Sequence, residues 1–216
     1  MATYAIAHNK GGAGKTTSTV HILPELKPDV VIDLDVHKGI SIINKFRPDD
    51  MKWPVRVITD KRELLSTLQE LDESGQTVLI DCGGFDADIT RAAVAVADVV
   101  IVPANDSMTE LLGLSTFDHT LAIISQQMGV EIQAKLMLCK THPNQINFPD
   151  IDQLLLDTKH ITRMENRLSY RTGRHGFQES VKKGLGVTEI RHGRNSSAGK
   201  EVIAVVEEMQ KIAHKM

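Results

Sequence analysis

The sequence predicts a doubly wound α/β fold, with a mostly parallel sheet and helices on both of its faces. Short apolar runs alternate with helix-length segments along nearly the whole chain, which is typical of repeated β-α units. The chain has 216 residues, 41% of them hydrophobic and 25% charged, and is therefore long enough to bury a substantial core. We expect a single domain over residues 1–216.

Six apolar runs are predicted to be strands, and the segments between them supply the helices. Pro24 is expected to end the first helix, and Ser107 and Glu110 have the spacing of a capping box before a later one. A final helix presents one apolar face that begins at Val202. The least regular pattern lies between residues 143 and 174. The predicted strands cover residues 3–8, 29–34, 54–58, 77–81, 98–103 and 132–139, and the other predicted helices cover 15–23, 61–73, 87–96 and 108–128.

Composition limits the class of protein. The longest nearly apolar run, residues 92–104, is interrupted by Asp98 and is shorter than the roughly 18 residues that a membrane span needs. No basic and apolar leader precedes the first predicted strand, so we expect no signal peptide. Cys82 and Cys139 lie in strand-like runs and have neither disulfide nor zinc spacing. We expect buried thiols, no membrane association and a cytoplasmic location.

The strongest chemical signal is a glycine-rich stretch that follows the first predicted strand and opens the first predicted helix. Glycines allow successive backbone N–H groups to point at phosphate oxygens, and the helix adds its positive amino-terminal end. In such a loop Lys15 would reach the β- and γ-phosphates and Thr16 would hold Mg²⁺. The alternative is a glycine-rich turn that binds nothing. The stretch is Lys10-Gly11-Gly12-Ala13-Gly14-Lys15-Thr16-Thr17.

Two aspartates support a site at the same place. Asp35 and Asp81 each lie just past or at the end of an apolar run, as Lys15 does after the first one. The carboxyl ends of parallel strands form the edge of a sheet where ligands bind. Asp81 would bind Mg²⁺ directly or through water. The alternatives are a helix cap for Asp81 and a turn residue for Asp35.

The glycine-rich stretch, with Lys10 in addition to Lys15, resembles the deviant Walker A motif of the ParA/MinD superfamily of ATPases. Residues 30–35 resemble the switch I strand of that superfamily, and residues 77–81 resemble its Walker B strand. Residues 97–103 are similar to the strand that comes next. The segment Arg167-Leu168-Ser169-Tyr170-Arg171 resembles a later part of the partition ATPases.

The resemblance implies ATP and Mg²⁺ as cofactors and a role for each polar residue. It implies that Asp35 positions or activates the attacking water, and that Asp33 supports the metal shell formed with Thr16 and Asp81. Lys10 would reach across a homodimer to the partner's phosphates; the alternative is an exposed lysine without a role. The sequence departs from the superfamily pattern after Asp35, where Val36-His37 replaces a common Pro-Gln, and at His21, where partition ATPases commonly have Asn.

The last third of the chain is basic. Between residues 159 and 200, ten Lys and Arg face three Glu, a net charge of +7, whereas the whole chain has a net charge of −3. This asymmetry favours a face that binds a polyanion, and the alternative is an ordinary solvated surface. The predicted contacts to nonspecific double-stranded DNA are Arg163, Arg167, Arg171, Arg174, Lys182, Lys183, Arg191 and Arg194.

The resemblance, most of all to small ParA-type partition ATPases, together with the basic segment implies a slow, Mg²⁺-dependent ATPase that dimerises on ATP, binds DNA and partitions or positions a plasmid or other cargo at the nucleoid. Because the first strand begins by Thr3, we expect a separate small protein to supply site-specific DNA recognition. The first alternative is a MinD-like or conjugation-associated positioning ATPase that acts through protein partners. The second is an ATP-dependent small-molecule ligase, which would leave Lys10 and the basic segment unexplained.

Overall fold

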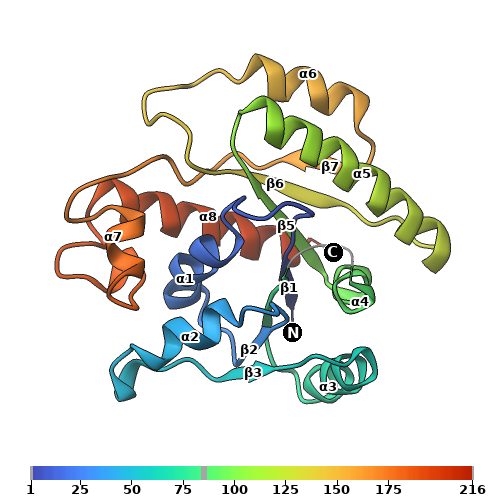
Figure 1. The fold of residues 1–216 in the computed structure, drawn as a ribbon, viewed down its shortest axis with the longest axis horizontal. Helices are drawn as coiled ribbons and strands as arrows, with labels where there is room; N and C mark the ends of the chain where they lie inside the picture. The colour runs from blue at the N-terminus through green and yellow to red at the C-terminus, as the bar shows by residue number, and fades with distance from the viewer. Residues whose placement is uncertain (1, 84–86, 216) are drawn as a thin grey trace.

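The computed structural model describes residues 2–83 and 87–215, and within them it contains one seven-stranded sheet (Figure 1). All six pairs of neighbouring strands are parallel, which confirms the predicted fold class. The strand order is β3-β2-β4-β1-β5-β6-β7, so β1 lies at the centre. The strands are β1 (Thr3–Ile6), β2 (Val30–Asp33), β3 (Val55–Val57), β4 (Val78–Asp81), β5 (Val99–Ala104), β6 (Ala134–Leu138) and β7 (Ile161–Arg163).

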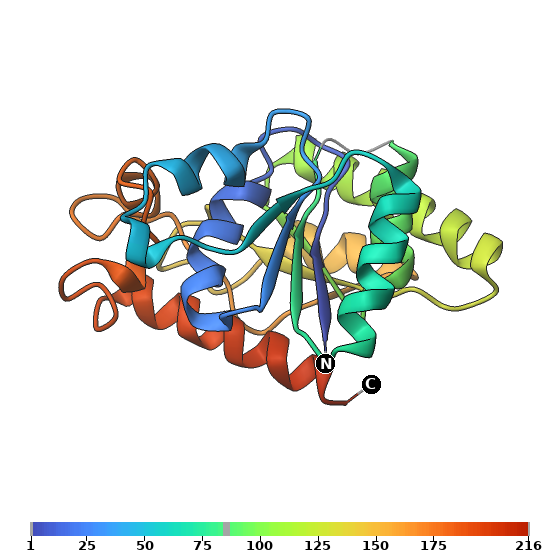
Figure 2. The same ribbon diagram turned by 90° about the horizontal axis from the view of Figure 1, so that it is seen from below.

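Helices cover both faces of this sheet. One face packs against α1, α2, α7 and α8, and the other packs against α3, α4, α5 and α6 (Figures 1 and 2). Each face therefore has its own apolar core. The helices are α1 (Lys15–Leu26), α2 (Gly39–Lys45), α3 (Lys61–Glu73), α4 (Asp88–Val96), α5 (Met108–Met128), α6 (Pro149–Asp157), α7 (Phe177–Val181) and α8 (Ser197–Ala213), with 3₁₀ turns η1 (Asp49–Met51) and η2 (Val187–Glu189).

The six predicted strands are all present in the sheet and are thereby confirmed. Four of them, β1, β2, β4 and β5, are buried along their whole length. The seventh strand, β7, was not predicted from the sequence. It has three residues at the edge of the sheet, and only Ile161 is buried. Helix α6 was not predicted either, because it lies in the irregular pattern between residues 143 and 174.

The prediction that Pro24 ends the first helix is wrong, since α1 continues to Leu26 and stops at Lys27 in the left-handed conformation. Proline removes one hydrogen bond, the one its missing N–H would have donated to Val20. Gly186 packs against this place, where an added Cβ would lie 2.7 Å from Pro24 Cγ and 2.9 Å from the Val20 oxygen. Tertiary packing therefore keeps the last turn helical.

The predicted capping box before α5 is also wrong, although the helix begins at Met108 as expected. The Ser107 side chain accepts no hydrogen bond from a backbone N–H of the first turn, and its Oγ instead shares a hydrogen bond with Thr109 Oγ1 at 3.2 Å. The Glu110 carboxylate turns instead toward Lys10, with 2.8 Å between Oε1 and Nζ. An ion pair with a distant segment thus replaces the local cap.

The two cysteines agree with expectation. Cys82 and Cys139 are buried free thiols. No helix in residues 2–83 and 87–215 combines the length and the apolar character required to cross a membrane.

Candidate nucleotide-binding site

The glycine-rich loop joins β1 to α1 at the carboxyl edge of the sheet, beside the loop that follows β2 (Figure 2). Gly12 has φ +80° and Gly14 has φ +108°, values that favour glycine because an L side chain is strained there. The α1 helix begins directly after Gly14, and no side chain caps its first turn. Its backbone N–H groups are therefore available to an anion at the loop.

Lys15 is buried under this loop, and its Nζ donates a hydrogen bond to the backbone oxygen of Lys10 at 2.9 Å. Burial lowers the pKa of its ammonium group, while Asp81 and Asp35 raise it. The ammonium thus donates to a neutral carbonyl oxygen of the loop. A charged phosphate oxygen would be a stronger acceptor for the same ammonium.

Asp81 lies at the end of β4, and the parallel register places it beside Asp33 on β2. Its two oxygens accept hydrogen bonds from the hydroxyls of Thr16 at 3.0 Å and Thr19 at 2.9 Å. Complete burial raises the pKa of the Asp81 carboxyl to about 7, although these two hydrogen bonds lower it. The site therefore holds a buried carboxyl and a hydroxyl, side by side, at the start of α1.

These groups fit a magnesium ion. Mg²⁺ prefers oxygen ligands and is held by one or two carboxylates together with substrate phosphates. Asp81 and the Thr16 hydroxyl supply such oxygens, and a cation would stabilise the buried carboxylate. Within residues 2–83 and 87–215 there is no cluster of three or more His, Cys, Asp and Glu side chains suited to a metal.

Asp33 and Asp35 shape the loop after β2. Both oxygens of the buried Asp33 carboxylate are used, since Oδ1 accepts from the Asp35 N–H at 3.1 Å and Oδ2 accepts from the Ser41 hydroxyl at 2.6 Å. Asp33 would therefore act on a metal shell through the loop it holds. Asp35 is half-buried and accepts a hydrogen bond from the His37 N–H at 2.9 Å. It faces the same cleft as Lys15.

The cleft above the loop has a volume of about 580 Å³ and is lined by the glycine-rich loop, by Asp35, Val36 and His37 on one side, and by Lys140 and Gln178 on the other. A smaller and mainly apolar cavity of about 140 Å³ adjoins it. Both cavities share part of the loop and Lys140. The pair offers a polar compartment for phosphates and an apolar compartment for a ring. The smaller cavity is lined by residues that include Gly14, Thr17, His21, Leu168, Tyr170 and Phe177.

Lys140 was not predicted, although it follows an expected strand at the ligand-binding edge of the sheet. Its backbone has φ +56°, an uncommon value for a residue with a side chain. Its Nζ donates a hydrogen bond to the backbone oxygen of Gly12 at 2.6 Å. This lysine thus braces the loop from the β6 side. Its position after β6 was the available signal.

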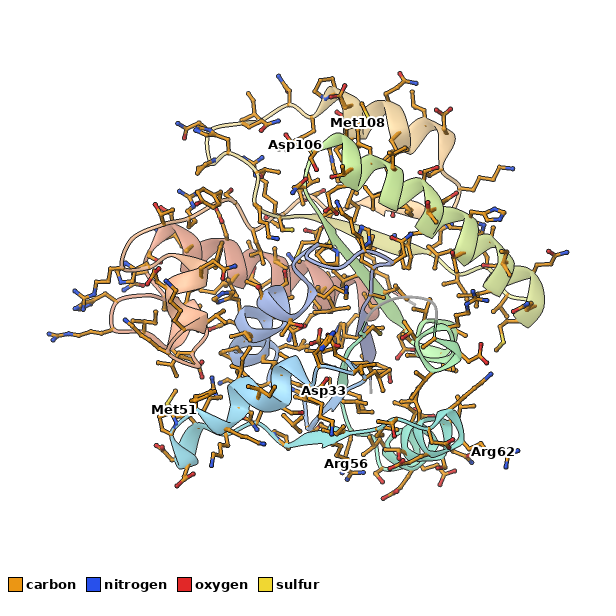
Figure 3. All side chains as sticks on the ribbon, viewed as in Figure 1. Asp33, Met51, Arg56, Arg62, Asp106 and Met108 are labelled. Carbon is orange, nitrogen blue, oxygen red and sulfur yellow. The ribbon has the colours of Figure 1, made fainter. Side chains whose placement is uncertain are left out.

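Lys10 does not extend freely into solvent. Its ammonium donates hydrogen bonds to Glu110 Oε1 at 2.8 Å and to Thr109 Oγ1 at 2.9 Å. Both partners belong to the first turn of α5, whose Met108 is labelled in Figure 3.

The predicted DNA-contacting residues do not form one continuous set. Arg163 belongs to β7, whereas the others lie between Arg167 and the turn before α8, beside α7 in Figure 1. Five of the eight have polar partners in the fold. The pairs are Arg163 with Asp152, Arg167 with the Pro143 oxygen, Arg171 with Glu201, Lys182 with Glu179, and Arg194 with Glu25.

The other three predicted contacts, Arg174, Lys183 and Arg191, are exposed. Among the residues that the structure describes, none of these three side chains forms a direct ion pair. Of the eight predicted contacts, these are the cations that remain available to meet an anion.

The parallel sheet, the glycine-rich loop after its central strand, and the buried Asp81 beside Thr16 together define the P-loop nucleoside triphosphatase fold. Comparison with known proteins agrees. A family model described as "ATPase MipZ" matches residues 48–132. The protein ParA of Rhizobium radiobacter is 27% identical over 109 residues, which make up 48% of each chain. The match thus spans about half the length of this curated relative.

Solved structures extend the likeness to nearly the whole chain. The cell division protein MinD of Aquifex aeolicus has a TM-score of 0.71 at 16% identity, with 98% of each chain covered. A Cyanothece McdA variant in complex with ATP has a TM-score of 0.67 at 15% identity, covering 99% of this chain and 96% of the other. Likeness at this identity concerns the fold. Taken with the two partial sequence matches, it supports an assignment of the chain to the ParA/MinD superfamily.

Proposed function

We propose that this chain binds ATP with Mg²⁺ in the cleft above the glycine-rich loop and hydrolyses it slowly. The observation that carries the proposal is the pairing of Thr16 with the buried Asp81, directly beside Lys15 and the uncapped start of α1. The Lys15 ammonium, the oxygens of Thr16 and Asp81 and the free N–H groups of α1 therefore lie close together at the loop. A phosphate chain with its metal ion is the ligand class that uses all three.

Each residue then has a defined task. Lys15 would leave the Lys10 oxygen for the β- and γ-phosphates, while Gly11 to Thr17 surround them with N–H groups. Asp35, which faces the cleft, would orient the attacking water. Mg²⁺, when bound, would neutralise charge that develops on the phosphates. Nothing in the described chain offers an arginine on the cleft lining beside Lys15, so we expect slow turnover unless a partner supplies a stimulating group.

The adjoining apolar cavity suits the nucleotide base. It lies against Gly14 and Thr17, where the loop passes into α1, and its walls include Phe177 and Tyr170. Apolar walls with few polar groups are typical of sites for planar ligands. We therefore place the adenine ring there and the phosphates in the larger cleft.

Variants at two positions test the ATPase proposal. Lys15→Ala should lose nucleotide binding, measured with a fluorescent ATP analogue, because the buried ammonium is removed. Asp35→Ala should keep binding and lose phosphate release. Lys61→Ala and Asp72→Ala change the same residue types on the exposed surface of α3 and should behave as wild type. Normal hydrolysis by the Asp35→Ala variant would contradict the role assigned to this aspartate.

We further propose that ATP joins two subunits and that the dimer binds double-stranded DNA nonspecifically, as part of a system that partitions or positions cargo with a small DNA-binding partner protein. Lys10 would contact the phosphates held by the partner subunit. Of the eight predicted contacts, Arg174, Lys183 and Arg191 are best suited to contact DNA, because they are exposed and form no direct ion pair with a described residue. Dimerisation doubles this patch and so raises its avidity.

Salt titration tests the DNA proposal. Log affinity should fall with log salt at a slope of about −0.9 for each phosphate contact, with ATP and not with ADP. Replacing Arg174, Lys183 and Arg191 together by Ala should flatten the slope by about 3 units for each subunit in contact with DNA. The matched control replaces Arg56, Lys61 and Arg62, which lie at β3 and α3 on another part of the molecule (Figure 3). An equal effect of both triple variants would reject the proposed surface.

A second candidate is a positioning ATPase that acts through protein partners without DNA. The five basic residues already held by polar partners favour it, because they reduce the charge left for a polyanion. Absence of DNA binding at low salt in the ATP state would select this candidate. The small-molecule ligase gains no support from the basic segment.

A further inference from the structure

A buried carboxylate at the start of α5 has a role that helix formation does not explain. Glu110 is only 4% exposed and forms no part of a cap. Its Oε1 lies 2.8 Å from the Lys10 ammonium, which also donates to Thr109. Charge-assisted hydrogen bonds of this kind are about twice as strong as neutral ones. Lys10 is therefore held on α5 of its own subunit.

The second oxygen of Glu110 faces His8. Oε2 lies 3.5 Å from His8 Nε2, and neither atom has a hydrogen-bond partner in the described chain. The His8 Nδ1 accepts a hydrogen bond from the Lys10 N–H at 3.0 Å, so the ring proton is on Nε2 and points toward the carboxylate. Burial lowers the pKa of His8 to about 4, so the ring is neutral near pH 7. Lys10 is thus the charged partner of Glu110.

The α5 helix is shaped to receive this segment. At Gly113, one turn after Glu110, an added Cβ would lie 2.9 Å from His8 Cε1, so the position must stay small. The His8 ring stacks on Phe117, a further turn along the helix, at 6.0 Å between ring centres. Glu110, Gly113 and Phe117 share one face of α5. The segment from His8 to Lys10 therefore packs against α5 along two turns.

We propose that Glu110 is a positioning residue which retains Lys10 in its own subunit and so opposes the dimerisation driven by ATP. The inference rests on the proposed function, in which Lys10 contacts the partner's phosphates. Among the residues described, Lys10 is the only cation in direct contact with Glu110. Its departure leaves a buried carboxylate without its ammonium, which is strongly unfavourable. Lys10 can therefore leave Glu110 for the partner subunit only when the phosphates held there bind its ammonium more strongly than Glu110 does.

The first test needs no dimer. Acylation of lysines by an amine-selective reagent, mapped by mass spectrometry without nucleotide, should label Lys10 slowly in wild type. Glu110→Gln keeps the shape and removes the charge, so Lys10 should be labelled at least about fivefold faster, since a charge-assisted bond that contributes about a factor of 10 is lost. Labelling of Lys61, an exposed lysine on α3, should not change. Equal labelling of Lys10 in both proteins overturns the proposal.

The second test measures dimerisation by light scattering with Mg²⁺ and a non-hydrolysable ATP analogue. Glu110→Gln should dimerise at least about tenfold more tightly than wild type, with the affinity of the monomer for ADP unchanged. Glu110→Asp, which keeps the charge, should lie closer to wild type. In a Lys10→Ala background, Glu110→Gln should have no effect on dimerisation. An equal effect with and without Lys10 would show a merely structural role and overturn the proposal.

The outcomes separate this inference from the proposed function. Suppose that Glu110→Gln speeds the labelling of Lys10, and that wild type dimerises just as tightly as the variant. The proposal that Glu110 opposes dimerisation is then refuted, whereas the proposed ATP-dependent dimer is retained. If neither protein dimerises, the cross-subunit function of Lys10 fails, and the inference fails with it. Should Glu110→Gln not fold, Thr109→Val removes the exposed second contact of Lys10. It should change labelling and dimerisation in the same direction by a smaller factor.

Discussion

His21 is expected to make the stability of this protein sensitive to acid. Its ring is fully buried on α1, where Nδ1 accepts from the Val187 N–H at 3.0 Å and Nε2 donates to the Phe177 oxygen at 3.2 Å. Protonation of the ring would place a proton on Nδ1, which would then face the Val187 N–H, so that two donors would point at each other. Burial lowers the pKa of His21 from 6.5 to about 4. The neutral ring therefore joins α1 to the segments that carry α7 and η2.

The sign and size of the effect follow from proton linkage. Since the unfolded chain binds a proton at His21 near pH 6.5 and the native chain does so near pH 4, stability is unaffected above pH 6.5 and falls as the pH drops through this window. At 1.36 kcal/mol per pH unit, the loss from pH 7 to pH 5 is about 2 kcal/mol. His21→Asn keeps a polar side chain that does not titrate, so its stability lacks this contribution.

Urea unfolding followed through the fluorescence of Trp53, the single tryptophan, measures the effect. At pH 7 we expect His21→Asn to cost about 2 to 4 kcal/mol, because one ring hydrogen bond and part of the buried ring are lost. At pH 5 the gap to wild type should shrink by about 2 kcal/mol. Buried His8 is present in both proteins and cancels, and His119→Asn on the exposed side of α5 is the control. Parallel pH dependences of wild type and His21→Asn would refute the reasoning.

Three further changes test the packing around the site. Arg47→Met should cost about 3 to 5 kcal/mol in urea unfolding, because it leaves the half-buried Glu189 without its guanidinium, and the double variant Arg47→Met/Glu189→Met should cost less. Gly193→Ala should lower the thermal midpoint severely or prevent folding, since its Cβ would lie 1.8 Å from a backbone oxygen. A thiol reagent should modify neither Cys82 nor Cys139 in the native protein at pH 8, because burial raises the pKa of both thiols; rapid native labelling would contradict this.

The features that could be predicted from the sequence are those that depend on residues within one short segment. The six main strands and the glycine-rich loop each depend on a short run of residues whose pattern survives in any tertiary context. The elements that were missed or wrong depend on distant partners. Pro24 stays inside α1 because Gly186 packs against it, and Glu110 leaves its capping role for Lys10, one hundred residues away in sequence. No pattern within one segment contains either contact.

The same reasoning applies to the basic segment, and it changes what the net charge means. Along the sequence, residues 159–200 carry +7. In space, Arg171 meets Glu201 and Arg194 meets Glu25, both acids that lie outside that segment. An ion pair presents little net field to a polyanion beyond a Debye length of about 8 Å at physiological salt.

A DNA surface built from the eight predicted contacts must therefore depend on the three left over, Arg174, Lys183 and Arg191. Three contacts per subunit correspond to weak, salt-sensitive binding by one chain, and two joined subunits would present twice that number. Because Glu110 opposes the joining step by holding Lys10, the strength of DNA binding and the retention of Lys10 become linked quantities. A charge on α5 that touches neither nucleotide nor DNA would then set how much ATP is needed before the chain holds DNA.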